Sequence, residues 1–239
     1  MKKPLIVGLT FVALVVGGIA ALPHLLPFTL SHYRSDIRFS VPRKSKTLFL
    51  TIDDVPSQNT AEILRVLKKY DVPATFFVMA DRVTSRSQLE EIVGAGQSLG
   101  NHLKTTRACS KLPLAEFKSD FDACSVLLER CAKPGFFRPA SDFGTEAQME
   151  YARSKGYQPV MGTVFPLDHW ISNPTWLVAI SRWLSVSGGI LILHDGPVRG
   201  LTTSQVLDRL IPQLVAAGFV FGRLEKEFNP SSGEPGPGP

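Results

Sequence analysis

Short apolar runs alternate along this chain with longer stretches in which apolar residues recur at helical spacing. Runs of about four to eight apolar and β-branched residues predict buried strands, and spacing of i, i+3, i+4 and i+7 predicts amphipathic helices. Strands are expected at residues 47–54, 74–79, 97–101, 136–137, 159–163, 189–193 and 219–221. Helices are expected at residues 60–70, 88–95, 114–131, 146–155, 175–186 and 205–217.

The alternation of strand and helix, repeated about seven times, predicts an α/β fold with a parallel sheet and helices outside it. Units in this number usually close into a barrel whose functional residues lie at the carboxyl ends of the strands. We therefore predict a distorted (β/α) barrel of about seven parallel strands, occupying residues 46–228.

The composition suits a single globular domain, since the 239 residues are 44% hydrophobic and 20% charged. The net charge of +5 is mild, and no cluster of Lys and Arg is interleaved with aromatic residues, so nucleic-acid binding is not expected. We expect a monomer.

Three cysteines, whose spacing matches no zinc signature, predict one possible disulfide and one buried thiol: Cys109, Cys124 and Cys131. Trp176 and Trp183, seven residues apart on one predicted helix, are expected in the core.

The two ends of the chain differ from its middle. Residues 4–28 contain no Asp, Glu, Lys or Arg and are mostly apolar, which exceeds a signal-peptide core and approaches the roughly 20 residues that cross a bilayer. This favours an uncleaved signal anchor at residues 1–31, followed by a linker at 32–45. Basic residues flank the apolar stretch on both sides, so charge does not fix its orientation. The tail at 229–239, rich in Pro, Gly and Ser, is expected to be disordered.

Ionisable residues follow the ends of several predicted strands. Asp53 and Asp54 end the first strand, where adjacent like charges oppose each other's ionisation. They could hold a metal, divide between ligand and base, or form a solvated turn. His102, Arg138, Asp168 and His194 lie at or after later strands. Because the carboxyl ends of parallel strands meet at one edge of a sheet, these residues are expected to form one site.

Five short motifs occur in order along the chain: Thr51-Ile52-Asp53-Asp54, Gly100-Asn101-His102, Arg138-Pro139, Asp168 with Trp170, and Ile190-Leu191-Ile192-Leu193-His194. On these residues the chain resembles the polysaccharide deacetylase family, which has the NodB homology domain and is also called carbohydrate esterase family 4. That family includes chitin and peptidoglycan deacetylases. The resemblance covers about residues 45–226.

The resemblance implies a role for each matched residue. Asp53 would be the general base, oriented by Arg138, and His194 the general acid, held by Asp168. Asp54 and His102 would be ligands of a divalent metal ion, with zinc expected and cobalt or manganese as alternatives. The ion would polarise the acetyl carbonyl and acidify the attacking water. Trp170, Ile192 and Pro139 would bind the substrate.

The implied reaction is the removal of N-acetyl groups from a chitin-like polysaccharide containing N-acetylglucosamine. Such polymers lie outside the cell or in a lumen, so the resemblance implies a membrane-anchored or secreted protein with its domain on that side. Deacetylation of xylan or peptidoglycan is an alternative.

One residue departs from the family pattern at the metal site. The family has a second His four residues after the first, but this chain has Thr106 there. A Thr hydroxyl is a poor zinc ligand, which opens the alternative of a weakly active or inactive member that only binds polysaccharide. His169, between Asp168 and Trp170, could supply the missing ligand.

Overall fold

The computed structural model describes residues 21, 25, 29–43 and 45–228. Most of the predicted anchor at 1–31 and all of the predicted tail at 229–239 lie outside these residues. Among the described residues, no helix has the length and apolar character needed to cross a membrane. Membrane attachment, the linker boundaries and the monomeric state stay predictions.

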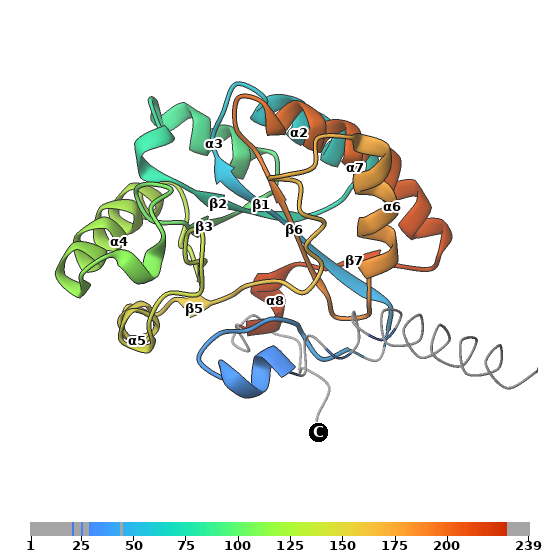
Figure 1. Ribbon diagram of the computed structural model, residues 1–239. Coiled ribbons are helices and arrows are strands. Elements are labelled where there is room, and N and C mark those ends of the chain that lie inside the picture. Colours follow the sequence, from blue (N-terminus) through green and yellow to red (C-terminus); the bar gives the residue numbers. More distant parts are fainter. Residues whose placement is uncertain (1–20, 22–24, 26–28, 44, 229–239) are drawn as a thin grey trace, which may run out of the picture.

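Within the described residues, seven parallel strands form one curved sheet at the centre of the molecule (Figure 1). Their order is β5–β4–β3–β2–β1–β6, and β7 also pairs with β1. The strands are β1 (Thr47–Val55), β2 (Ala74–Val78), β3 (Ser98–Asn101), β4 (Phe136–Phe137), β5 (Gln158–Pro159), β6 (Ile190–His194) and β7 (Val220–Phe221).

The helices lie outside the sheet, as the alternating pattern predicts (Figure 1). They are α2 (Thr60–Tyr70), α3 (Arg86–Gly94), α4 (Leu114–Glu129), α5 (Glu146–Ser154), α6 (Pro174–Leu184), α7 (Arg199–Ala216) and α8 (Leu224–Phe228), with short 3-10 helices η1 (Ala80–Arg82) and η2 (Cys109–Lys111). The predicted fold class, a distorted barrel of parallel strands and outer helices, is confirmed.

Two elements differ from the sequence prediction. Strand β5 has two residues instead of five, because Val160 and Val164 make only single bridges, to Arg38 and Leu191. Helix α7 begins at Arg199, six residues earlier than predicted. Its first turns bury small or polar residues such as Thr203 instead of apolar ones, so they carry no amphipathic pattern.

Strand β1 is buried along its whole length and divides its side chains between two environments. Leu48, Leu50 and Ile52 join a core cluster that includes residues of α2 and α7. Side chains alternate along a strand, so Thr51 and Asp53 point to the opposite face, toward the interior of the barrel. This alternation places an ionisable group inside the barrel end.

Residues 34–41, between the predicted anchor and the first strand, pack against the barrel. Ile37, Phe39 and Val41 are buried. Arg34 forms a bidentate ion pair with Asp36 and donates to the carbonyl oxygens of Phe143 and Gly144 at 3.0 and 3.1 Å. The segment therefore braces the loop after β4.

Two smaller expectations are wrong. All three cysteines are free thiols, so the expected disulfide is absent from the described residues. Trp176 and Trp183 are 65% and 48% exposed, because the buried stripe of α6 consists of Leu177, Val178 and Ser181.

Candidate active site

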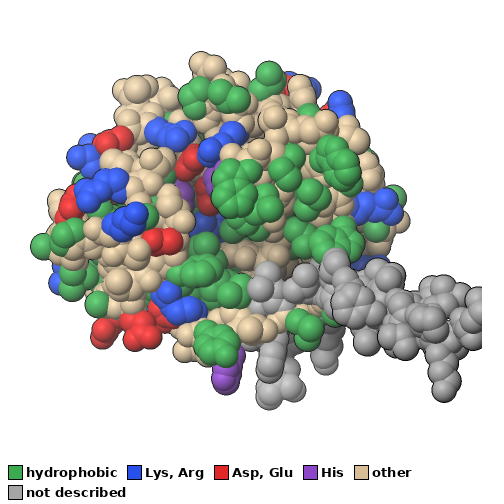
Figure 2. Space-filling view, viewed as in Figure 1, with side chains coloured by type: hydrophobic (Ala, Val, Ile, Leu, Met, Phe, Trp, Pro, Cys, Tyr) green, Lys and Arg blue, Asp and Glu red, His purple; other side chains and the backbone are tan. Residues whose placement is uncertain are grey.

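A cleft of about 1160 Å³ opens at the carboxyl ends of the strands. Five of the six ionisable residues singled out from the sequence line it: Asp53, Asp54, His102, Arg138 and His194. The sixth, Asp168, lies behind His194. Figure 2 shows the cleft as a hollow with Lys and Arg side chains on one side and hydrophobic side chains on the other.

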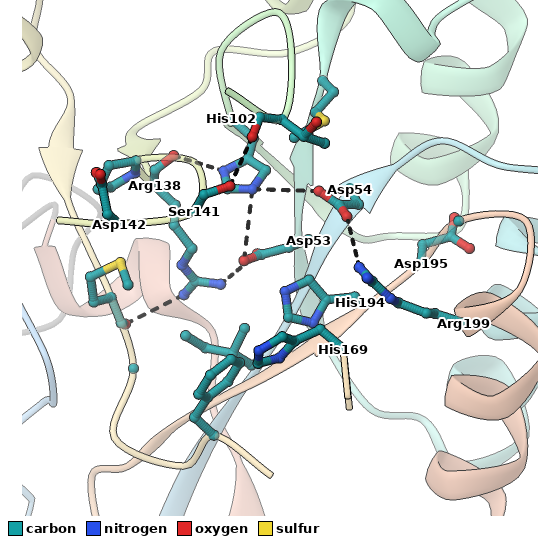
Figure 3. Close-up of a pocket in the computed structure, with 18 of the residues that line it drawn as sticks. Asp53, Asp54, His102, Arg138, Ser141, Asp142, His169, His194, Asp195 and Arg199 are labelled. Carbon is teal, nitrogen blue, oxygen red and sulfur yellow. Dashed lines mark hydrogen bonds and ion pairs between the residues drawn. The ribbon is translucent and has the colours of Figure 1, made fainter. Parts of the chain in front are cut away.

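Arg138 and Asp53 form a buried ion pair inside the barrel (Figure 3). Arg138 Nη1 lies 2.6 Å from Asp53 Oδ1 and 2.7 Å from Thr51 Oγ1. The rest of the guanidinium donates to the carbonyl oxygens of Val160 and Met161 at 3.3 and 3.4 Å. These bonds fix Asp53 and leave its second oxygen free toward the cleft.

The charge state of Asp53 follows from its neighbours. Burial alone would raise the pKa of this carboxyl group, but the positive charge of Arg138, joined by those of His102 and His194 when these rings are protonated, outweighs it and lowers the pKa. Asp53 is therefore ionised at neutral pH and able to accept a proton.

His102 follows β3 and has a fixed tautomer. Its Nδ1 lies 2.7 Å from the carbonyl oxygen of Arg138, which can only accept, so Nδ1 carries the proton. In the neutral ring the lone pair on Nε2 then faces the two carboxylates, at 3.7 Å from Asp54 Oδ1 and 3.9 Å from Asp53 Oδ2. Nε2 is available as a ligand atom.

His102 is held in place by neighbours on two strands, Gly100 and Asn101 on β3 and Phe77 on β2. Asn101 is buried, and its side chain accepts from the backbone N–H of Leu103 at 2.8 Å, where φ is +65°. The ring of Phe77 lies edge-on to His102 and under the guanidinium of Arg138, 4.1 Å from its centre. A Cβ at Gly100 would come within 2.6 Å of that ring, so only glycine leaves room for Phe77.

His194 ends β6 and is held by Asp168. Its Nδ1 lies 2.8 Å from Asp168 Oδ1, and its backbone N–H donates to Asp168 Oδ2 at 2.7 Å. Burial opposes protonation of the ring, but the hydrogen bond and charge of Asp168, with those of Asp53 and Asp54, raise the pKa of His194. The ring can therefore carry a proton on Nε2.

Asp54 lies next to Asp53 but points another way, since its φ of +65° turns the backbone. Its Oδ2 lies 3.7 Å from Arg82 Nη2 and 3.6 Å from Arg199 Nη1. Its other oxygen faces His102, so the carboxylate is shared between an imidazole and two guanidinium groups.

Asp54 and His102 provide the donor types that a divalent ion such as Zn²⁺ accepts, a carboxylate and an imidazole nitrogen. Thr106, which the motif match aligns with the family's third ligand, lies exposed at the edge of the cleft. Among the residues with described positions, no group of three or more His, Cys, Asp or Glu side chains is arranged to hold a metal ion. The chain fits such an ion in donor type, with one donor fewer than catalytic zinc sites use.

His169 does not complete this donor set. Its ring stacks on Phe165, with centroids 5.0 Å apart, and its centroid lies 6.0 Å from that of His194. Burial, followed by the charge of His194, lowers the pKa of His169. The idea that His169 replaces the missing ligand is therefore not supported by its position.

The three residues expected to bind substrate all line the cleft: Trp170, Ile192 and Pro139. Trp170 is 78% exposed at the rim, beside His169. Four residues that support the site were not predicted from the sequence: Phe77, Arg82, Asp195 and Arg199. Each reaches the site through a contact between distant parts of the chain, and no local sequence pattern shows such a contact.

The family model for polysaccharide deacetylases matches residues 40–160. The chain belongs to the polysaccharide deacetylase family. A peptidoglycan-N-acetylglucosamine deacetylase of Bacillus cereus is 27% identical over 77% of this chain and 89% of that protein. A solved peptidoglycan N-acetylglucosamine deacetylase has a TM-score of 0.77 and 26% identity, covering 83% of this chain and 95% of that one.

This family also includes a relative of another kind. A CE4 family pseudoenzyme from Bacillus anthracis has a TM-score of 0.73 and 26% identity, over 80% of this deacetylase-family chain and 68% of the solved chain. Membership in the family therefore does not by itself establish turnover, which depends on the residues of the cleft.

Proposed function

We propose that this protein is a hydrolase that removes N-acetyl groups from N-acetylglucosamine units of a polysaccharide, with a divalent ion as cofactor. The observation that carries the proposal is a pair of opposed groups in one cleft. Asp53 is kept ionised by Arg138, and Asp168 raises the pKa of His194 so that its ring can carry a proton. Amide hydrolysis needs one base and one acid of this kind.

Asp53 is the proton acceptor in this proposal. Its Oδ1 is bound to Arg138, so its Oδ2 is the atom that takes a proton from an attacking water. The ion pair keeps the carboxylate aimed and charged before the reaction begins, which removes the cost of orienting it during the reaction.

His194 is the proton donor. The departing amine is a poor leaving group unless it is protonated, and Nε2 of His194 supplies that proton. Asp168 stabilises the imidazolium and sets its orientation, the task of the carboxylate in other His–Asp pairs. No covalent nucleophile is required.

Asp54 and His102 would hold the divalent ion, which would polarise the acetyl carbonyl and lower the pKa of the attacking water. Zinc suits the imidazole and carboxylate donors, and cobalt or manganese are alternatives.

The walls of the cleft support a sugar substrate. Ile192 is a wall against which an acetyl methyl group could pack, and Trp170 at the rim offers a flat apolar face for a sugar ring. Peptidoglycan and chitin-like polymers both present N-acetylglucosamine, and the similarity to peptidoglycan deacetylases favours testing peptidoglycan beside chitin oligomers.

The test is acetate release from chitin oligomers and from peptidoglycan with added Zn²⁺, comparing the wild type with His194→Ala. We expect a loss of about 10²–10⁴-fold, because that is the usual contribution of a general acid. Zn²⁺ affinity by calorimetry should stay unchanged, since His194 is not a ligand. His32→Ala, at an exposed position outside the cleft, is the matched control.

A second function, sugar binding without turnover, is favoured by Thr106 and by the similarity to a pseudoenzyme. It predicts that chitin oligomers quench tryptophan fluorescence in the wild type and less in Trp170→Ala, while acetate release stays at the level of His194→Ala. Acetate release well above that level would exclude it.

A further inference from the structure

Asp54 has two positive neighbours on the oxygen that points away from His102. Arg82 and Arg199 reach the same atom, Oδ2, from different parts of the chain (Figure 3 shows Arg199). The charge of the predicted metal ligand is thus already balanced by the protein. A divalent ion would have to enter beside these cations.

The two arginines are held differently. Arg82 also donates from Nη1 to the backbone carbonyl of Asp54 at 2.9 Å, and its side chain is 27% exposed. Arg199 is 43% exposed, and Asp54 is its one ion-pair partner among the residues that the structure describes. Arg199 is therefore the guanidinium that can leave.

The position of Arg199 is not explained by its own helix. It opens α7, where the partial positive charge of the helix end disfavours a cation. The negative charge of Asp54 compensates for this placement. The position of the Arg199 side chain is therefore set by its attraction to Asp54 and not by its place in α7.

The loop before Arg199 is fixed by a network around Asp195. This buried carboxylate accepts from Ser57 Oγ at 2.6 Å and Thr60 Oγ1 at 2.5 Å, and Asn59 donates to the carbonyl of Gly196 at 2.8 Å. A Cβ at Gly200 would collide with the Asp195 carboxylate. The backbone of Arg199 is thereby held within reach of Asp54.

We propose that Arg199 is the built-in counter-ion of Asp54, and that it sets the metal affinity of the site by competing with the divalent ion. The inference rests on the proposed function, because it concerns the ion expected there. Like charges repel strongly in a partly buried cleft, so the ion binds with its full affinity only when the Arg199 side chain swings out to solvent. With only two donors, the site lacks the additional ligand that would outweigh this competition.

Calorimetric titration of the full chain with Zn²⁺ tests the proposal. Arg199→Gln and Arg199→Met should each bind Zn²⁺ at least tenfold more tightly than the wild type. Arg199→Lys keeps the charge and should stay within about threefold of the wild type. Arg209→Gln removes the same charge from an exposed position on the same helix and should change nothing.

Thermal unfolding of each variant without metal shows that it is folded. Equal or weaker Zn²⁺ affinity in folded Arg199→Gln and Arg199→Met would overturn the proposal. So would tightening in Arg209→Gln of the same size, because it would show a general charge effect.

Acetate release, measured separately, keeps the two proposals apart. Tighter Zn²⁺ binding in the Arg199 variants without any acetate release would uphold the role of Arg199 and reject the hydrolase. Acetate release with unchanged Zn²⁺ affinity would do the reverse.

Discussion

Asp168 forms two hydrogen bonds with His194, with Oδ1 at 2.8 Å from the ring Nδ1 and Oδ2 at 2.7 Å from the backbone nitrogen. The same carboxylate therefore fixes the ring and the strand end that carries it. Its burial strengthens both bonds, because little water competes for its oxygens. Among the residues that raise the pKa of His194, Asp168 therefore contributes most.

Replacing Asp168 with Asn should lower the pKa of His194, because the negative charge that raises it is lost. A general acid works only while protonated, so activity falls as the pH rises through its pKa. In Asp168→Asn the alkaline limb of the kcat/KM profile should therefore move to lower pH, and the rate should drop about 10²–10⁴-fold.

An NMR titration of the His194 ring checks the same shift without relying on turnover. Asp208→Asn, a surface carboxylate on α7, is the control and should leave the titration unchanged. A titration curve of Asp168→Asn that overlays the wild type would show that Asp168 does not set this pKa.

The buried pair of Arg138 and Asp53 predicts a large loss of stability when one partner is removed. Arg138→Met should lower the free energy of unfolding by about 3–5 kcal/mol at neutral pH, because Asp53 is left charged and unpaired. The Asp53→Asn/Arg138→Met double variant should recover most of that loss. Urea unfolding measures all three proteins.

The pH dependence of that loss has a definite sign. The pKa of Asp53 is lowered in the folded protein, so its contribution to stability is present at neutral pH and lost as the pH falls through the folded value. The difference between wild type and Arg138→Met should therefore shrink in acid. A difference that is constant with pH would mean that packing, and not charge, accounts for the loss.

Thr106→His should restore a third donor to the metal site. An imidazole four residues after His102 would face the ion held by Asp54 and His102, the arrangement that a catalytic zinc site uses. We expect Zn²⁺ to bind at least tenfold more tightly, equivalent to about 1.4 kcal/mol. Thr105→His, beside the cleft instead of in its wall, is the control. Equal affinities for the two variants would show that position 106 does not reach the ion.

Gly100→Ala tests the packing behind the site. The added methyl group would lie 2.6 Å from the Phe77 ring, which supports both His102 and Arg138. We expect a loss of about 1–3 kcal/mol in unfolding free energy and weaker Zn²⁺ binding, because His102 moves with the ring. Gly94→Ala has no atom within 4 Å of its new Cβ and should be neutral or stabilising by about 0.5–1 kcal/mol. If Gly100→Ala and the wild type have equal unfolding free energies, the Phe77 ring can move aside without cost.

The sequence predicts the barrel and its strand ends well, because both are carried by local patterns. Asp53 and His194 follow apolar runs directly, so their placement at one edge of the sheet follows from the parallel arrangement. Arg82 and Arg199 could not be found this way. Each reaches Asp54 from another segment, and Arg199 begins a helix whose first turns lack an apolar stripe.

The helical spacing of two residues does not predict their burial, because burial depends on which side of the helix packs against the rest of the protein. Trp176 and Trp183 share one side of α6, but the contact with the rest of the protein runs through Leu177 and Ser181. Helical period alone shows that two residues share a side, and it does not show which side is covered. The short β5 is a second example, because Val160 and Val164 make single bridges to Arg38 and Leu191 instead of extending the ladder with β4, and the apolar run alone does not show this.

Arg34 binds the loop carbonyls of Phe143 and Gly144 directly, and Leu30 lines the cleft beside them. A truncation that begins after residue 34 would therefore remove part of the rim along with the segment before it. The segment at residues 29–41 thus enters the domain beside the opening of the cleft, and a polymer lying across that opening would have to pass this side of the molecule.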